Sequence, residues 1–209
     1  EMTLEELNEL KEAHMVAQIC DPSFSSRYKK EGDKKSRFSI IHSIVNEDSY
    51  MVYNAWQTFG MDTGGIKDVN IQLGKKEDID FFIQDAQGQG QTGLFDEQIR
   101  LMRDAIPYLA SFKHTKSLGR KEEVANKVLS LLCEMREIVV VKIKDDPDEE
   151  RRKFINRLIN QLLGIGGMDF VDCVVYMVSD IDRNTDVRAA RLRKNLKRNK
   201  NKGFRNISL

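Results

Sequence analysis

The segment from Gly88 to Gly93 has a spacing that could carry chemistry, because it matches the pattern G-x-G-x-x-G. In dinucleotide-binding folds, such glycines let the backbone approach a pyrophosphate at a helix N-terminus. The preceding residues, however, have helical rather than strand spacing, and no acidic strand end follows about 20 residues later, as that fold requires. We therefore interpret the segment as a Gly/Gln-rich connector and expect no cofactor.

A second candidate is the acidic turn that begins at Asp180, in which oxygen-bearing side chains alternate with other residues. The alternation resembles the first half of an EF-hand calcium loop. Thr185, however, stands where the sharp turn needs glycine, and Arg191 stands where a bidentate glutamate is needed. A turn between two helices is the favoured interpretation, so no metal site is predicted. The candidate ligands, if a metal did bind, are Asp180, Asp182, Asn184 and Asp186.

Other residues with catalytic potential are scattered along the chain. The three histidines form no H-x-x-x-H pair, and the three cysteines form no C-x-x-C pair. No G-x-S-x-G, P-loop or H-E-x-x-H motif occurs. Carboxylates such as Asp78, Asp80 and Asp85 are interpreted as a solvated helix face. No catalytic residue is predicted and the sequence favours a protein that is not an enzyme, with a metal- or nucleotide-dependent enzyme as the third alternative.

The distribution of charge is the feature with most functional content. The chain carries 34 Lys and Arg against 33 Asp and Glu, a net charge of +1. Residues 188–209, the basic tail, hold nine of the cations and no acid, which leaves 25 cations against 33 acids in residues 1–187. A second group of cations lies in residues 23–37, the basic loop. The predicted phosphate contacts are Arg27, Lys29, Lys30, Lys34, Lys35 and Arg37 in the loop, and Arg188, Arg191, Arg193, Lys194, Lys197, Arg198, Lys200 and Lys202 in the tail.

Cations repeated along a helix suit the phosphates of a nucleic-acid backbone, and each contact releases counterions. The tail therefore predicts a non-enzymatic, self-associating helical protein that binds nucleic-acid backbones, with RNA favoured over DNA, such as a nucleoprotein or assembly factor. The alternative is a helical protein–protein interaction or scaffold domain from a larger intracellular protein, whose tail meets an acidic partner or its own acidic body. An anionic membrane surface fits less well, because the tail has few apolar residues.

Helical spacing dominates the elements that must position these residues. Apolar side chains recur at helical intervals in residues 52–59, 79–86, 96–109, 124–138 and 154–163, and helix is slightly favoured over strand for 38–45. Thr3 and Glu6 form a capping box that predicts a first helix up to about Ile19, and Asp146 is the predicted N-cap of a later helix. The expected fold is mainly α, a compact multi-helix domain of about eight to ten helices, with at most a minor β element near 66–73.

The Gly/Gln-rich connector is the favoured internal boundary. It separates an N-terminal helical subdomain, residues 1–87, from a C-terminal helical subdomain, residues 94–187, and the basic tail follows, unless all three form one domain. The odd number and the spacing of the cysteines indicate a reducing compartment, so we expect an intracellular protein, cytoplasmic or nuclear. The most apolar stretch, residues 162–178, contains two carboxylates, so no transmembrane segment is expected.

Overall fold

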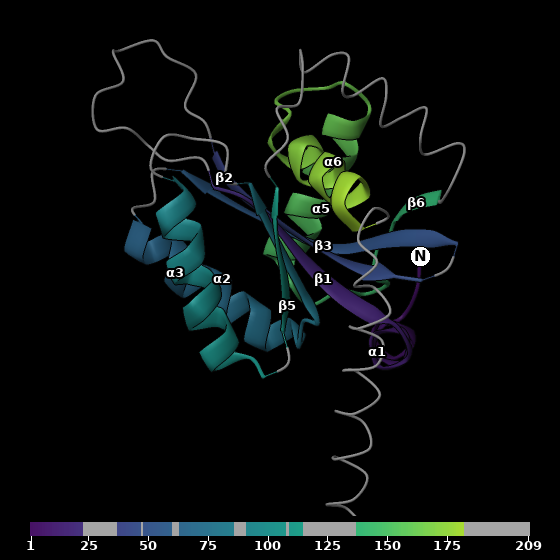
Figure 1. The fold of residues 1–209 in the computed structure, drawn as a ribbon. Coiled ribbons are helices and arrows are strands. Elements are labelled where there is room, and N and C mark those ends of the chain that lie inside the picture. The colour runs from purple at the N-terminus through teal and green to yellow at the C-terminus, as the bar shows by residue number, and fades with distance from the viewer. Residues whose placement is uncertain are drawn as a thin grey trace, which may run out of the picture.

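The structure is a computed structural model that describes residues 1–22, 37–46, 48–59, 63–85, 91–107, 109–114 and 137–181. Strands and helices are interspersed along these residues (Figure 1). The strands are β1 (Met15–Asp21), β2 (Arg37–Val45), β3 (Ser49–Phe59), β4 (Phe81–Asp85), β5 (Ala110–His114) and β6 (Glu137–Val140). The helices are α1 (Leu4–Ala13), α2 (Thr63–Glu77), α3 (Gln91–Ala105), α5 (Glu149–Leu162) and α6 (Asp169–Ile181).

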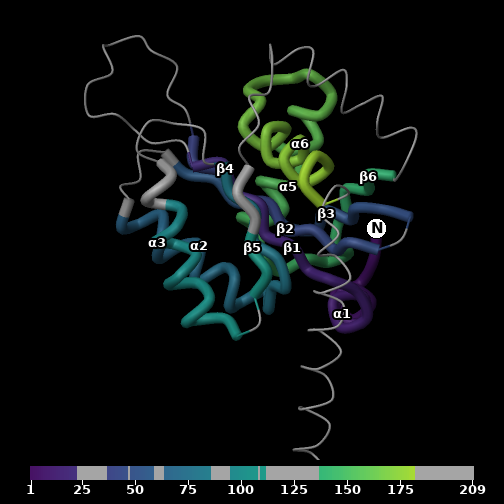
Figure 2. The backbone as a smooth tube through the Cα atoms, in the orientation of Figure 1, coloured from purple at the N-terminus to yellow at the C-terminus, as the bar shows by residue number. Residues whose placement is uncertain are grey.

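The six strands form one sheet in the order β5-β4-β1-β2-β3-β6. β1, β2 and β3 pair antiparallel, whereas β4 pairs parallel with β1, β5 parallel with β4, and β6 parallel with β3. Helices α2 and α3 cover one face of the sheet and α5 and α6 cover the other, as the tube in Figure 2 also shows. The expected mainly α fold is therefore wrong, because the described residues form a mixed α/β fold built on a six-stranded sheet.

The strands have misleading helical spacing because both faces of the sheet are buried. In β2, Ile41 and Val45 belong to the core under α5 and α6, while Ile40 and Ile44 belong to the core under α2 and α3. A strand that is buried on both faces has a continuous apolar run instead of an alternating one. The helices expected over 38–45, 52–59 and 79–86 are for this reason the strands β2, β3 and β4.

The opposite error occurs at residues 66–73, which were expected to hold a minor β element and instead belong to α2. The inner face of α2 carries Ile66, Asn70 and Glu77, and all three are buried. Two of these residues are polar, so the apolar period of the helix is broken even though its inner face packs on the sheet. The buried polar residues have partners on the strands, as described below.

Signals that depend on neighbouring residues are more accurate. The capping box is confirmed: Glu6 N donates to Thr3 Oγ1 at 3.2 Å, and Thr3 N donates to Glu6 Oε2 at 2.7 Å. α1 nevertheless ends at Ala13, because the chain enters β1 at Met15. The cap of α5 is Asp148, whose side chain accepts from Arg151 N, and not the predicted Asp146.

Two apolar cores lie on the two faces of the sheet. One joins the sheet to α5 and α6, and the other joins it to α1, α2 and α3. α6 is apolar and buried around most of its circumference, which accounts for the apolar stretch noted in the sequence. Within the described segments, every helix is too short or too polar to span a bilayer.

Candidate active site

Asp21 and Asp85 end two neighbouring parallel strands at the same edge of the sheet. β1 and β4 pair with Cys20 opposite Gln84, so the next residue on each strand is a carboxylate. On each strand, the carboxylate lies an even number of positions from the residues that belong to the core under α5 and α6. Because side chains alternate between the two faces of a strand, both carboxylates point to that same face. The carboxyl ends of strands are where open α/β sheets place their ligand sites. Strand register therefore brings together two carboxylates that are distant in the sequence.

Helix α6 lies over the same edge and brings two further carboxylates. Asp169 and Asp172 are both in its first turn. The Cys173 thiol lies 3.6 Å from the backbone oxygen of Ser39, and Ser39 pairs with Asp21 in the β1–β2 ladder. The beginning of α6 is thus anchored beside the end of β1. We refer to this edge, with its carboxylates from β1, β4 and α6, as the carboxylate edge.

The electrostatics of Tyr176 show how these carboxylates converge. Burial raises the pKa of the Tyr176 hydroxyl above its ordinary value, and the charges of Asp21, Asp85 and Asp172 raise it further. Burial also raises the pKa of the Cys173 thiol, and Asp21 and Asp172 are among the charges that add to this effect. Three separate elements therefore direct negative charge toward one buried position on α6.

The other carboxylate of α6, Asp169, is held by the end of β3. Gln57, which is 6% exposed, donates from Nε2 to Asp169 Oδ2 at 3.3 Å and to Ser39 Oγ at 2.8 Å. The Gln57 Oε1 accepts a hydrogen bond from Arg37 Nη1 at 3.1 Å. Ser39 pairs with Gln57 in the β2–β3 ladder, and Arg37 is two residues earlier on β2. The carboxylate edge thus continues into a row of hydrogen-bonded side chains on β2 and β3.

A glycine turn sets the position of α6. Gly164 and Gly166 have φ values of +79° and +98°, in the left-handed region that glycine adopts without a steric penalty. Phe170 N then donates to Gln161 Oε1 at 2.8 Å, which ties the first turn of α6 to the end of α5. The helix predicted over residues 154–163 is confirmed as the second part of α5, which ends at Leu162, just before this turn. The turn brings α6 back onto the sheet with its two carboxylates at the carboxylate edge.

The donor set at this edge consists of carboxylate oxygens, which are ligands that hard divalent cations such as Mg²⁺ and Mn²⁺ prefer. The residue types therefore suit such a cation, and Asp21, Asp85 and Asp172 are the candidate ligands. In the part of the chain that the structure describes, however, no group of three or more His, Cys, Asp or Glu side chains is arranged so that it could hold a metal ion. The fit is thus one of residue type and of position on neighbouring elements, and not of a formed site.

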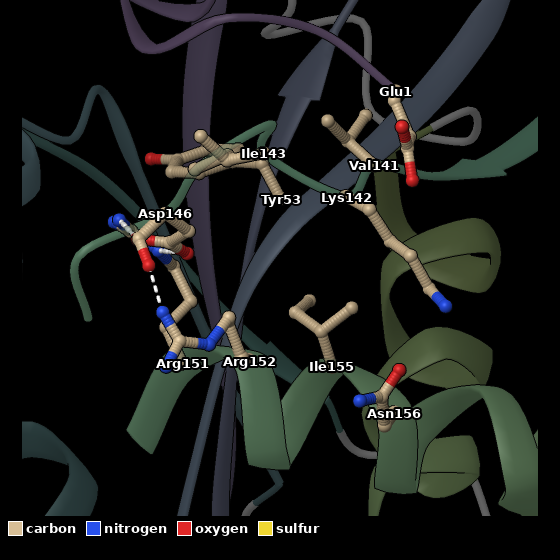
Figure 3. A pocket seen from close by; sticks show the side chains of 10 residues that line it. All are labelled: Glu1, Tyr53, Val141, Lys142, Ile143, Asp146, Arg151, Arg152, Ile155 and Asn156. Carbon is tan, nitrogen blue, oxygen red and sulfur yellow. Dashed lines mark hydrogen bonds and ion pairs between the residues drawn. The ribbon is translucent and has the colours of Figure 1, made fainter. Parts of the chain in front are cut away.

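A pocket of about 190 Å³ lies next to Tyr53 and the beginning of α5. Figure 3 shows Asp146 paired with Arg151 at the side of this pocket. The hydrogen bond with Arg151 lowers the pKa of Asp146, and the same bond raises the pKa of Arg151. The opposite charges of Asp146 and Arg151 compensate each other in this pocket. We therefore place the candidate site at the carboxylate edge, where carboxylates of like charge lie together.

Most residues selected from the sequence lie outside the described residues. Of the predicted phosphate contacts, the structure describes only Arg37, which belongs to the row beside Asp169. Of the candidate metal ligands, it describes Asp180 in the last turn of α6, and Asp182, Asn184 and Asp186 lie beyond the described range. The helix predicted over 96–109 is present as α3, but it begins at Gln91, within the glycine motif, and ends at Ala105.

The sequence reasoning missed the carboxylate edge. Asp85 was expected on a solvated helix face, and Asp21 was expected to end a helix. The sequence did contain a pattern that points to these two carboxylates: each comes at the end of an apolar stretch, which the structure shows to be β1 or β4. Asp169 and Asp172, three residues apart, share one side of a helix. These patterns acquire meaning only when 15–21 and 81–85 are recognised as strands that lie side by side.

Three solved structures illustrate what this chain is similar to. The nuclease domain of the large terminase g2p from bacteriophage SPP1, with bound Mn, is 13% identical, with 84% of this chain and 89% of that chain covered and a TM-score of 0.50. The large terminase nuclease from thermophilic phage G20c is 12% identical, with 80% and 82% covered and a TM-score of 0.49. The yeast mitochondrial Holliday junction resolvase is 12% identical, with 83% of each chain covered and a TM-score of 0.46. No family model and no curated protein matches the sequence.

The likeness to the SPP1 domain shows that the chain has the RNase H-like fold of that nuclease domain. The expectation of a non-enzymatic, all-helical nucleic-acid-binding protein is wrong: the fold is mixed α/β, and the SPP1 domain that shares this fold is a nuclease domain. The error has a physical cause. Charge composition reveals a basic tail, but it holds no information on carboxylates that only sheet register brings together.

Proposed function

We propose that the protein is a nuclease that hydrolyses phosphodiester bonds with a divalent cation held by Asp21, Asp85 and Asp172. The observation that carries the proposal is the convergence of these carboxylates, from β1, β4 and α6, on one edge of the sheet. It is supported by the fold, which is shared with a terminase nuclease domain that is described with bound Mn.

Each carboxylate has a part in this proposal. Asp21 and Asp85 stand at adjoining strand ends and offer oxygens to the same cation. Asp172 offers oxygens from α6, and Asp169 is held in place by Gln57. Tyr176 stays protonated at neutral pH, since its pKa is raised, and adds no further negative charge among the carboxylates. A bound divalent cation supplies charge neutralisation at the phosphate and a water of lowered pKa.

The cations predicted from the sequence remain the proposed contacts to the nucleic-acid backbone. The basic loop follows Asp21 directly in the chain, and the basic tail comes soon after α6. The basic loop thus follows β1 in the chain, and the basic tail follows α6. Both groups of cations are therefore close in sequence to elements that carry the carboxylates. Self-association and the preference for RNA over DNA remain predictions.

A cleavage assay tests the proposal. Short labelled DNA and RNA oligonucleotides, single- and double-stranded, are incubated with the protein and Mg²⁺ or Mn²⁺. We expect metal-dependent cleavage of at least one substrate, and we expect Asp172→Asn to reduce its rate by at least about 100-fold, because one of the oxygen donors is lost. The control is Asp104→Asn on α3, whose carboxylate is 70% exposed on the opposite face and should leave the rate unchanged.

The proposal fails if the wild-type protein cleaves none of these substrates with either cation. It also fails if the wild-type activity persists undiminished in Asp172→Asn. Thermal unfolding of both variants shows that a lost rate reflects the site and not a lost fold.

A further inference from the structure

The row Arg37–Gln57–Asp169 gives one of the proposed backbone contacts, Arg37, a defined place at the carboxylate edge. Arg37 is half-buried at the first position of β2. Arg37, Ser39 and Ile41 occupy every second position of β2 and therefore lie on the same face, and Ile41 belongs to the core under α5 and α6. Arg37 therefore points to the same face of the sheet as the carboxylates, and it brings positive charge to an edge where negative charges are gathered.

Gln57 fixes the direction of this guanidinium. Its side chain is 6% exposed, so its amide group needs hydrogen-bond partners inside the protein. The Nε2 donates to Ser39 Oγ and Asp169 Oδ2, and this leaves Oε1 turned toward Arg37. Both ends of the amide are therefore assigned by their partners, since a carboxylate can only accept and a guanidinium can only donate. The arginine and Asp169 are linked through a neutral amide.

The position of Arg37 suits a phosphate of the substrate. Ser39 is opposite Asp21 in the β1–β2 ladder, and Arg37 lies two residues farther along the same strand, a distance of about 7 Å along the backbone. A guanidinium presents its N–H donors in a planar fork that matches phosphate oxygens, and the hydrogen bond from Nη1 to Gln57 Oε1 sets the direction of that fork. A polyanion that approaches gathered carboxylates needs such a compensating charge.

From this geometry we infer that Arg37, oriented by Gln57, binds a phosphate of the nucleic acid at the carboxylate edge. The inference rests on the proposed nuclease function. Arg37 acts on the substrate by contact, and Gln57 is a positioning residue that acts through Arg37. Gln57 thereby connects the placement of Asp169 on α6 with the placement of the phosphate contact on β2.

The test is the salt dependence of oligonucleotide binding, measured by fluorescence anisotropy with the same labelled DNA and RNA oligonucleotides and with Ca²⁺ in place of Mg²⁺. Each phosphate contact contributes about 0.7–0.9 to the slope of log K against log salt concentration. We expect Arg37→Gln to lower that slope by about one contact and to weaken binding roughly ten-fold at low salt. Arg37→Lys should keep the slope, because it keeps the charge.

Two further variants distinguish direct phosphate contact by Arg37 from the positioning of Arg37 by Gln57. Gln57→Leu should keep the slope but weaken binding by roughly three-fold, since the cation remains and loses its orientation. Arg100→Gln is the matched control, because Arg100 is an exposed arginine on α3, on the opposite face of the sheet. It should leave both slope and affinity at the wild-type values. Thermal unfolding is measured for each variant alongside.

The outcomes distinguish the two proposals. A wild-type protein that cleaves its substrate while Arg37→Gln keeps the full slope overturns the role of Arg37 and leaves the nuclease proposal standing. An equal drop in slope for Arg37→Gln and Arg100→Gln also overturns it, because the effect would then be one of general charge. A wild-type protein that neither binds nor cleaves any oligonucleotide overturns both.

Discussion

The two faces of the sheet treat buried charge in opposite ways. On the face covered by α1 and α2, Glu77 is 4% exposed and accepts hydrogen bonds from Lys11 Nζ at 2.6 Å and Tyr53 Oη at 3.0 Å. On the face covered by α5 and α6, several carboxylates instead gather around the buried Tyr176. One face matches a negative charge with a positive one, and the other brings like charges together.

The Glu77 side extends into a neutral network that includes His42. The His42 Nε2 lies 3.0 Å from Gln18 Oε1, and Asn54 Nδ2 donates to His42 Nδ1 at 3.3 Å. This arrangement requires a neutral ring, which donates from one nitrogen and accepts at the other. Gln18 then donates to Asn70 Oδ1 at 2.9 Å. The polar groups of this network satisfy one another, as is typical of groups that support the fold.

The contrast between the two faces distinguishes buried charges that support the fold from buried charges that suit a function. A matched pair lowers the cost of burying charge, whereas like charges held close together raise it. A fold that gathers carboxylates therefore stores an electrostatic cost that a bound cation relieves. Buried groups with perturbed pKa values mark candidate functional sites, and Tyr176 and Cys173 are such groups beside these carboxylates. The comparison leads to three predictions on stability, in order of decreasing effect.

The largest effect is expected from Glu77→Ala. The substitution removes the carboxylate that accepts from Lys11, whose side chain is 18% exposed, and from the buried Tyr53 hydroxyl, so we expect a loss of about 4 kcal/mol of unfolding free energy, measured by urea denaturation. The matched control is Glu97→Ala, which breaks an ion pair with Lys67 of the same 2.6 Å length whose acid is 49% exposed. It should cost less than about 1 kcal/mol. Equal losses would contradict the role assigned to burial.

The next effect is a dependence of stability on pH. Burial lowers the pKa of His42 from 6.5 to about 4, even though Glu77 acts to raise it. Between these values the unfolded chain binds more protons than the folded chain, so stability falls as the pH drops from 6.5 to 4. The full loss is about 3 kcal/mol. Denaturation at several pH values should show this decline in the wild type and a flatter profile in His42→Gln. Parallel profiles would disprove the assignment to His42.

The smallest effect should have the opposite sign. Asp85→Asn removes one of the like charges at adjoining strand ends, so in the presence of a chelator we expect a gain of about 0.5 kcal/mol. With Mn²⁺, the wild type should gain thermal stability through binding, and the variant should lose most of this gain. Asp104→Asn serves as the control and should respond to Mn²⁺ as the wild type does. An unchanged Mn²⁺ response in Asp85→Asn would argue against a cation at the carboxylate edge.

Individual residues show why some of the fold could be predicted and some could not. The Thr3 capping box was identified correctly, because Thr3 and its partner Glu6 lie within one helical turn. The strand β2 was not identified, because Ile40 and Ile41 are both buried, on opposite faces, and leave no alternation to detect. α2 was missed because its inner face carries Asn70 and Glu77. Errors of this kind come from contacts made after the elements assemble.

For the candidate site, the residues alone specify an inventory: apolar stretches that lead to a carboxylate, glycines before an acidic stretch, and a basic tail set against an acidic body. Which of the carboxylates meet depends on how the strands pair. Asp21 and Asp85 become neighbours because β1 and β4 pair in register, and Arg37 joins them because β2 runs antiparallel beside β1. Local signals depend on the nearest residues in the chain, whereas strand order and register depend on burial between segments that are distant in sequence.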